Sequence, residues 1–555
     1  MSKTFTIECR DNESIRVSFT KFVLFGISLV LTVGACSFLR PEANGWSEGP
    51  QVIKVNPSQN LQAVIDKARP GDVIELEAGA VYKGPIELKA KSGDSFITIQ
   101  SSRAGELPEG SRVGPTQSAL IAKLQSATAG APVIKTAAGS HHYRLVGLDI
   151  STAKADVLVY DLVRIGDARQ TSAEVPHDIV IDRSWIHGFD TQEVQRGVSL
   201  NGSEVTISNS YISEIHGRGY DTQAICGWNG PGPFHIINNY LEAAGENILF
   251  GGADPSITNL VPSDIEIRRN YLFKPLRWKM KDPSYAGIHW SVKNLLEIKM
   301  GRNIVIDGNV MENSWGDAQI GYAVLFTVRN QDGKAPWSTI ENVIFTNNTV
   351  KNSEQGFQLL GSDNLNASQR ASGLEITNNL FTGISNRFLT MTAYAKVTLN
   401  HNTHFQNGNI MSLYGEPSTG FVYTDNITNR AANGYGIFGD SVGEGKAALA
   451  RYAPGNTFTK NIISGAAASS YPPDNFYPAN IEDIGFQDYS GETIGFLQKV
   501  NSKTSRVRRP IRVVNLTAFP VIKKQVLDNF GQNGVNGVEP LDGSVLDLLN
   551  SIAKR

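Results

Sequence analysis

The chain has 555 residues, of which 41% are hydrophobic and 19% are charged. Because 51 Lys and Arg residues nearly balance 53 Asp and Glu residues, the formal net charge is only -2, and no overall field favours a nucleic acid partner. The three cysteines, Cys9, Cys36 and Cys226, lie far apart, which excludes both a disulfide framework and a cysteine metal site.

The first 36 residues predict a lipoprotein signal peptide. An apolar stretch from Phe22 to Ala35 follows Lys21 and is too short to span a bilayer. It closes on Val33-Gly34-Ala35-Cys36, which resembles the lipobox of bacterial lipoproteins. This resemblance implies that Cys36 is acylated after cleavage and, with Ser37 next to it, that the exported protein is anchored in the outer membrane. A plain secretory signal or an uncleaved anchor is the alternative.

A linker rich in Pro and Gly, residues 37–50, separates this anchor from the body of the protein. Helical spacing of apolar residues follows within 61–68, and Pro70-Gly71-Asp72 then turns the chain into an apolar strand at 73–76. We expect this amphipathic helix to cap one end of a solenoid, since an open sheet edge would otherwise be exposed.

One short unit recurs through residues 51–465. It consists of two apolar residues in alternation, two variable residues, Asn, a variable residue and an apolar residue. The clearest copies are 234–241, 265–272, 304–311, 343–350 and 374–381. The intervals between copies vary but share a lower limit, which is typical of coils whose strands are fixed and whose turns accept insertions.

The recurring Asn lies at the turn that ends each strand. Stacked coils repeat at roughly 4.8 Å, so each buried amide can bond to the amides above and below it. The sequence therefore predicts an all-β fold, a right-handed parallel β-helix solenoid with an internal asparagine ladder and an N-terminal capping helix. The solenoid is expected over 51–465, and residues 466–555 are expected to form a C-terminal cap or tail, with a helical pattern at 545–552.

The helix, Pro-Gly-Asp turn and strand, followed by Gly79 and Tyr82, resemble the start of pectin-lyase-like β-helix proteins. Residues 86–99 are similar to chondroitinase-B-like polysaccharide lyases, and the resemblance extends over about residues 50–465. It implies binding and β-elimination of a uronate-containing polysaccharide by a Lys and an Arg on consecutive coils. The segment Leu296-Glu297-Ile298-Lys299-Met300-Gly301 resembles the family's Arg segment, with Lys299 in place of Arg, whereas the preceding coil, 246–254, lacks the family's Lys.

Outward positions on neighbouring coils provide the candidate catalytic residues. Lys299 and Arg329 can supply the base and the cation that β-elimination needs, and Glu246 lies on the preceding coil. The alternative interpretation is an exposed charge ladder of Glu297, Lys299 and Arg329 with little energetic value.

A second cluster of polar residues lies between residues 187 and 254. The carboxylates of Asp221, Glu246 and Asp254 suit either acid–base hydrolysis or Ca²⁺ binding, and Asp221 and Asp254 are the candidate metal ligands. Arg218 and Trp228 are candidate substrate-binding residues. Turn formation and capping are the alternative roles, because Gly, Asn and Asp are what tight turns require.

The segment from Lys274 to Lys293 is an insertion that combines aromatic and cationic residues. Such a combination favours sugar stacking and carboxylate binding, and a packed loop lid is the alternative. The candidate substrate-binding residues here are Arg277, Trp278, Lys279, His289 and Trp290.

Taken together, the residues and the resemblance predict a surface-anchored, monomeric lipoprotein that binds an extended acidic polysaccharide and cleaves it as a lyase. Ca²⁺ is the one cofactor that the sequence suggests. The rival hypothesis is a non-catalytic β-helix that binds glycan or serves as a structural surface element.

Overall fold

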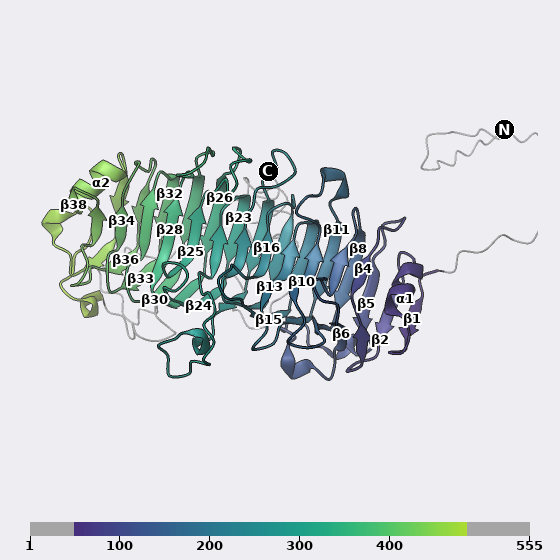
Figure 1. The fold of residues 1–555 in the computed structure, drawn as a ribbon. Coiled ribbons are helices and arrows are strands. Elements are labelled where there is room, and N and C mark those ends of the chain that lie inside the picture. The colour runs from purple at the N-terminus through teal and green to yellow at the C-terminus, as the bar shows by residue number, and fades with distance from the viewer. Residues whose placement is uncertain (1–48, 485–555) are drawn as a thin grey trace, which may run out of the picture. The chain divides into compact units, whose positions relative to one another are not determined.

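The computed structural model describes residues 49–484, in which 40 strands stack into three long sheets (Figure 1). The expected signal peptide with Cys36, nearly all of the linker and the helical pattern at 545–552 lie outside the described residues. No helix in the described part is long and apolar enough to cross a membrane.

Each coil of the stack contributes one strand to each of the sheets, here called sheets A, B and C. Sheet A consists of β1 (Val52–Val55), β2 (Val73–Leu76), β5 (Ile97–Ser101), β8 (His141–Val146), β11 (His177–Asp182), β14 (Ser203–Ser208), β17 (Phe234–Ile237), β20 (Ser263–Arg268), β23 (Gly301–Asp307), β26 (Ile340–Thr346), β29 (Ser372–Thr377), β32 (Ala395–Asn400), β35 (Val422–Thr424) and β39 (Thr457–Thr459).

Sheet B follows sheet A in each coil, across the turn that carries the recurring Asn. It consists of β3 (Val81–Lys83), β6 (Ala122–Ser126), β9 (Leu148–Thr152), β12 (Trp185–His187), β15 (Tyr211–Ile215), β18 (Tyr240–Ala243), β21 (Tyr271–Phe273), β24 (Val310–Ser314), β27 (Thr349–Ser353), β30 (Leu380–Ile384), β33 (Thr403–Gln406), β36 (Ile427–Asn429) and β40 (Ile462–Ser464).

Sheet C completes the coil and is reached from sheet B through loops of very different lengths. It consists of β4 (Ile86–Leu88), β7 (Ile134–Thr136), β10 (Val159–Ile165), β13 (Val194–Leu200), β16 (Gln223–Gly227), β19 (Glu246–Phe250), β22 (Leu296–Ile298), β25 (Tyr322–Thr327), β28 (Gln355–Leu360), β31 (Leu389–Thr392), β34 (Met411–Leu413), β37 (Ile437–Gly439) and β38 (Gly443–Glu444).

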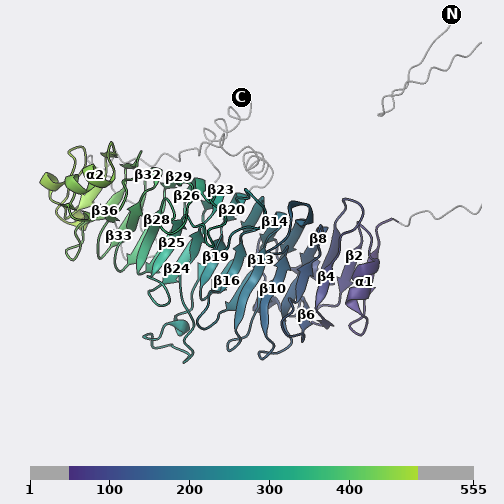
Figure 2. The same cartoon turned by 45° about the horizontal axis from the view of Figure 1, so that its top comes forward.

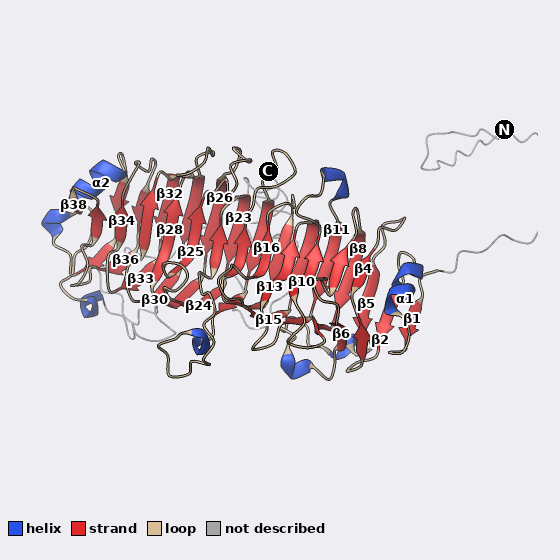
Figure 3. Ribbon diagram, in the orientation of Figure 1, coloured by secondary structure: helices blue, strands red, loops and turns tan. Residues whose placement is uncertain are grey.

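Nearly every strand pairs in parallel with the equivalent strand of the next coil, and only β37 and β38 pair antiparallel. Short helices occupy the loops and the ends of the stack, as Figures 2 and 3 show. They are α1 (Leu61–Lys67), α2 (Lys446–Tyr452) and the 3₁₀ turns Ala104–Glu106, Pro115–Gln117, Ser172–Glu174, Leu276–Trp278, Ala468–Ser470 and Ile481–Ile484. The architecture is a right-handed parallel β-helix.

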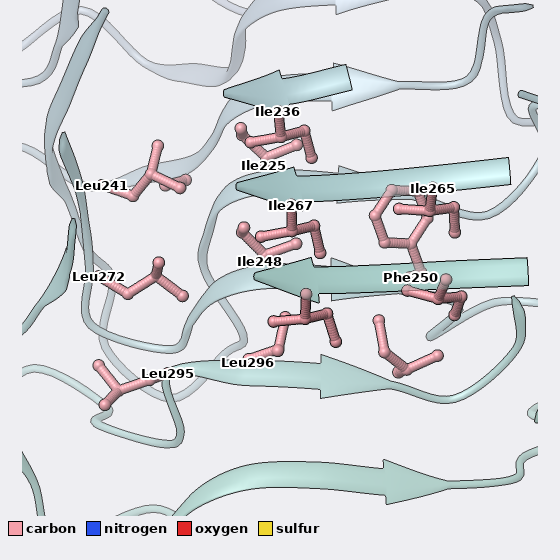
Figure 4. Packing of buried hydrophobic residues seen from close by; sticks show 14 of the residues in the cluster. Ile225, Ile236, Leu241, Ile248, Phe250, Ile265, Ile267, Leu272, Leu295 and Leu296 are labelled. Carbon is pink, nitrogen blue, oxygen red and sulfur yellow. The ribbon is translucent and has the colours of Figure 1, made fainter. Parts of the chain in front are cut away.

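The core is a column of apolar side chains that point inward from all three sheets. Equivalent residues of successive coils stack on one another, for example Ile236 on Ile267 in sheet A and Ile225 on Ile248 in sheet C (Figure 4). The alternation of apolar and polar residues in each strand produces this column, because successive side chains of a strand point to opposite faces.

A ladder of side-chain amides runs beside the column at the turn between sheets A and B. Asn239, Asn270, Asn309, Asn348, Asn379, Asn402 and Asn426 each donate from Nδ2 to the Oδ1 of the next ladder residue, over 2.9 to 3.1 Å. Each Nδ2 also donates to a backbone carbonyl, as Asn379 does to Phe345 O at 2.9 Å. Asn461 continues the ladder to Asn475 at 2.8 Å, a member that the repeat did not reveal.

Both ends of the column are covered by helices. Leu61 and Ile65 of α1 join the core cluster at the first coil, and Ala448, Leu449 and Tyr452 of α2 join it at the last. The structure thus places a capping helix at 446–452, inside the range expected to be solenoid. The chain beyond it adds β40 and buries Tyr471 against the same core.

Candidate functional site

The outer face of sheet C carries a row of polar side chains, one from each coil. Arg196, Gln223 and Glu246 are paired in register on three successive coils. The register then continues through Leu296, Val324, Phe357 and Leu389. The residue two positions before each of these four continues the row. We call these residues the outer row: Arg196, Gln223, Glu246, Asn294, Tyr322, Gln355 and Arg387.

Most residues of the outer row are buried, but many of their polar atoms lack hydrogen-bond partners. Among the described residues, twelve buried side-chain polar atoms lack a hydrogen-bond partner. Six of them lie in this row: Arg196 Nε, Gln223 Oε1, Glu246 Oε1, Asn294 Oδ1, Gln355 Oε1 and Arg387 Nε. Because leaving a buried polar group unpaired costs roughly 1 to 3 kcal/mol, this concentration makes the row the candidate binding surface.

Glu246 is at the centre of the row, and its carboxylate is fully buried. Gln223 Nε2 donates to Glu246 Oε2 at 2.8 Å. Burial, together with the negative charge of the nearby Glu297, raises the pKa of Glu246. A carboxyl group with a raised pKa keeps its proton near neutral pH and can donate it to a leaving group.

Glu297 on β22 faces the same site and is only 2% exposed. Asn294 Nδ2 donates to Glu297 Oε2 at 3.0 Å and to Gln319 Oε1 at 2.9 Å, which fixes the orientation of both side chains. The structure corrects the alternative of an exposed charge ladder here, because Glu297 is enclosed by its neighbours and lies beside a second carboxyl group.

Two lysines bring positive charge to these carboxylates. Lys293 Nζ lies 3.6 Å from Glu246 Oε1 and 2.5 Å from Asp221 Oδ1. Burial alone would lower the pKa of Lys293, but Glu246 and Asp221 raise it above its ordinary value. Lys299 Nζ lies 3.8 Å from Glu297 Oε1. Alternating carboxylates and ammonium groups therefore surround one point on the face of sheet C.

The corner that presents Glu246 is held by the buried Lys274. Its Nζ donates to three successive carbonyls, Ala243 O, Ala244 O and Gly245 O, at 2.7 to 2.9 Å. Burial lowers the pKa of Lys274. A Cβ at Gly245 would meet Thr222 O at 2.3 Å, so only glycine permits this close approach of adjacent coils.

Arg329, the expected catalytic partner of Lys299, has other contacts. Its backbone N donates to Lys299 O at 3.1 Å, which places the two residues on neighbouring coils as expected. Its guanidinium bonds to Asp363, at 2.9 Å, and to Asn364 of the following coil. The structure thus brings Lys299 and Glu246 to the same cluster, while Arg329 is engaged in a separate ion pair.

Trp228 lies at the edge of the sheet C face, where it packs with Cys226 and Leu249. The guanidinium of Arg196 is 5.0 Å from the centroid of its ring and also lies 3.3 Å from Asp161. Trp228 is 8% exposed, so it supports Arg196 rather than offering an open ring face to a sugar.

The two tryptophans of the 274–293 insertion form a small core of their own. Trp278 and Trp290 are each 2% exposed and cluster with Ala244, Val292 and Trp315. His216 stacks on Trp290 with ring centroids 3.9 Å apart. The alternative of a packed loop therefore describes these two residues, because neither presents a ring face to solvent.

The charged candidates around this insertion have partners within the protein. Arg277 Nη2 bonds to Glu214 at 2.5 Å, and His289 Nε2 lies 2.7 Å from Asp317. Arg218 is 65% exposed and binds Glu193 through two nitrogens. Lys279 lines a cavity of about 650 Å³ with Lys281, Trp315 and Glu354, outside the outer row.

The two aspartates expected as metal ligands lie in different surroundings. Asp221 binds Lys293 in the cluster around Glu246. Asp254 Oδ2 instead accepts from the backbone N atoms of Asp332 and Lys334, at 3.1 and 2.7 Å, and so caps that loop. At Asp221, Lys293 supplies a neighbouring positive charge.

A pocket of about 470 Å³ extends the outer row toward the last coils. Residues of sheet C and the following turns line it, among them Tyr322, Gln358, Arg387, Tyr414, Tyr435 and Phe438. Tyr322 OH lies 2.5 Å from Thr390 Oγ1. The pocket combines aromatic rings with a guanidinium group, and sequence patterns did not single it out, because its residues come from separate coils.

The fold that the sheets define is a right-handed parallel β-helix. Searches of protein-family profiles and of curated proteins found no match to the sequence. Among solved structures, an alginate lyase from Paenibacillus sp. is 15% identical and covers 62% of this chain and 99% of its own, with a TM-score of 0.38. A mannuronic acid specific family 6 lyase from human gut microbiota is 11% identical over 91% of this chain and 99% of its own, with a TM-score of 0.39.

An α-1,3-glucanase from Streptomyces thermodiastaticus is also similar, with 11% identity, coverage of 80% of this chain and 72% of its own, and a TM-score of 0.48. These proteins are similar to the chain in the course of the backbone. Because a fold by itself does not fix an activity, the chemistry of this protein has to be argued from its own side chains.

Proposed function

We propose that the protein binds an extended, uronate-containing polysaccharide along the outer row of sheet C and cleaves it by β-elimination. The observation that carries this proposal is the series of unpaired, buried polar atoms at successive coils. Coils repeat at about 4.8 Å, so the row offers hydrogen bonds at regular intervals along a straight line, as an extended polymer requires.

The charges of the cluster support an acidic sugar as the substrate. Lys293 and Lys299 lie beside the carboxyl pair on the face of sheet C. A uronate carboxylate bound between these cations would have its charge neutralised, which makes the proton at C5 more acidic. A neutral sugar would have no need of the two cations.

The two glutamates have different surroundings, and we assign them different roles in the reaction. Glu246 has the raised pKa and acts as the general acid. Glu297, with its ion pair to Lys299, acts as the general base. Glu297 takes the proton from C5, the bond from C4 to the leaving oxygen breaks, a double bond forms between C4 and C5, and Glu246 protonates the leaving oxygen. No water is consumed.

We further propose that the protein is exported and held at the outer membrane through acylated Cys36, so that this face meets polymers outside the cytoplasm. Membrane fractionation of wild-type protein and of the Cys36→Ala variant tests this part. The anchor is supported if only the wild type remains with the membranes, and it is overturned if both variants fractionate alike.

The function is tested by incubating the purified protein with alginate, pectate and chondroitin sulfate, with and without EDTA. Lyase activity predicts growing ultraviolet absorbance of unsaturated products from at least one polymer. If new reducing ends form without ultraviolet absorbance, the reaction is hydrolysis and not elimination. The same pair of glutamates is suited to hydrolysis as acid and base. If the protein binds a polymer but produces neither absorbance nor reducing ends, the lyase proposal is overturned in favour of a glycan-binding role. Loss of activity in EDTA would show that the reaction requires a metal ion.

A further inference from the structure

A group of histidines lies on sheet A, away from the outer row. His141 and His142 begin β8, and His177 and Asp178 begin β11. His177 Nδ1 lies 2.7 Å from Asp178 Oδ2, and His142 Nε2 lies 3.9 Å from the same oxygen. The ligand atoms of His142, His177 and Asp178 are all within 4.8 Å of one another.

The coil register explains why residues far apart in the sequence meet here. His141 and His177 are paired in parallel register, and their rings stack with centroids 4.8 Å apart. His142 and Asp178 occupy the next position of the two coils, and both have left-handed backbone, with φ of 57° and 53°. The equivalent turns therefore present their side chains at the same place on neighbouring coils.

The fourth residue of the group strengthens the arrangement. His141 Nδ1 lies 2.8 Å from His142 Nδ1, and the His141 ring stacks on His177, so His141 holds the rings of both histidines in place. Glu204 occupies the equivalent turn of the next coil, where it adds a second carboxylate beside Asp178. This part of the surface concentrates negative charge, which favours a bound cation.

We propose that His142, His177 and Asp178 bind a divalent transition-metal ion, best suited to Zn²⁺, with the fourth position left to water. Imidazole and carboxylate are ligands that Zn²⁺ prefers, and tetrahedral bonds of about 2.0 to 2.1 Å place ligand atoms roughly 3.3 Å apart. The observed separations of 2.7 and 3.9 Å lie on either side of that value. Small rotations of the partly exposed rings bring the ligands to it.

The bound ion would join two successive coils through their side chains. Its ligands come from the turns that lead into β8 and β11, so it would act as a cross-link near the N-terminal end of the stack. The role is structural and independent of the proposed lyase activity, because the site and the outer row are carried by different sheets.

Zinc binding by the untagged protein, in competition with a chromophoric chelator, tests this site. We expect one Zn²⁺ per chain, an affinity at least tenfold lower in His177→Gln and in Asp178→Asn, and a melting temperature that zinc raises only in the wild type. Asn adopts left-handed backbone readily, so Asp178→Asn removes the charge while keeping the turn.

The matched control is His289→Gln, which changes a histidine that also pairs with a single aspartate, Asp317, at 2.7 Å. Its zinc affinity should equal that of the wild type. The proposal is overturned if the wild type binds less than one equivalent, or if His177→Gln and Asp178→Asn, shown to be folded by circular dichroism, bind zinc as tightly as the wild type.

Discussion

The asparagine ladder and the outer row of sheet C are two buried polar series that run along the same stack, yet their hydrogen bonds are distributed in opposite ways. In the ladder, Asn379 Oδ1 accepts from both nitrogens of Asn348, and Asn379 Nδ2 donates to Asn402 Oδ1 and Phe345 O. In the outer row, six buried polar atoms have no hydrogen-bond partner. One series completes its bonds within the protein, and the other leaves them for a ligand.

This difference teaches how a solenoid separates stability from function. A saturated ladder lowers the cost of burying amides and fixes the register of the coils. An unsaturated row costs stability in the free protein, and that cost is recovered when a ligand binds. Polar substitutions should therefore affect folding in one series and activity in the other.

The largest effect is expected from Glu297→Gln, which removes the proposed general base and keeps the shape of the side chain. We expect kcat to fall by about 10²- to 10⁴-fold, as is usual for the loss of acid–base catalysis, with little change in polymer affinity. Initial rates and equilibrium binding measure the two quantities. Activity within threefold of the wild type would remove Glu297 from the mechanism.

Next in size is the effect of Asn379→Leu in the ladder. It leaves Phe345 O and the backbone N of Asn348 without partners, so we expect unfolding to require roughly 3 kcal/mol less free energy. Chemical denaturation measures this, and Asn433→Leu, at an exposed asparagine, provides the control. Equal stability of the two variants would contradict the structural role of the ladder.

The pH dependence should follow Glu246. Because Glu246 must be protonated to act as an acid, kcat/KM should fall about tenfold per pH unit once the pH exceeds its raised pKa. The fall should be absent from the residual activity of Glu246→Gln. An alkaline limb that persists in this variant would assign it to another group.

The smallest effect on stability is expected from Gln355→Leu in the outer row. This change removes from a buried site the Oε1 atom that lacks a hydrogen bond. The free energy of unfolding should therefore change by less than about 1 kcal/mol, while polymer affinity falls roughly two- to tenfold. Calorimetry and binding assays separate the two. A loss of stability as large as that of Asn379→Leu would remove the distinction between the two series.

The repeat was predictable from the sequence because it is local. Strand alternation and the Asn at each turn lie within eight residues, so the pattern at 265–272 indicates the same coil wherever it recurs. Asn475 escaped notice because a proline-rich segment, not a strand of the repeat, supplies it. The cap at α2 was missed because it lies inside the range that the repeat assigned to the solenoid.

The site was less predictable because it depends on loops of unequal length. Lys293 and Asn294 end a long insertion, and only the folded coil brings them beside Glu246. Glu297, Lys299 and Arg329 were recognised as outward-facing residues, but no spacing indicated that Arg329 would bind Asp363 or that Glu297 would be buried. The tryptophans of the insertion suggested sugar stacking, and their packing against His216 is visible only in three dimensions.

The account is tested most directly by comparing Glu246→Gln with Glu242→Gln on the substrate polymer. Both glutamates are buried and have raised pKa values. Glu242, however, lies on β18 of sheet B, where Tyr240 OH donates to it at 2.7 Å. We predict that Glu246→Gln lowers kcat at least 100-fold and that Glu242→Gln leaves it unchanged. Equal activity of the two variants, or a loss confined to Glu242→Gln, would contradict the placement of the active site on sheet C.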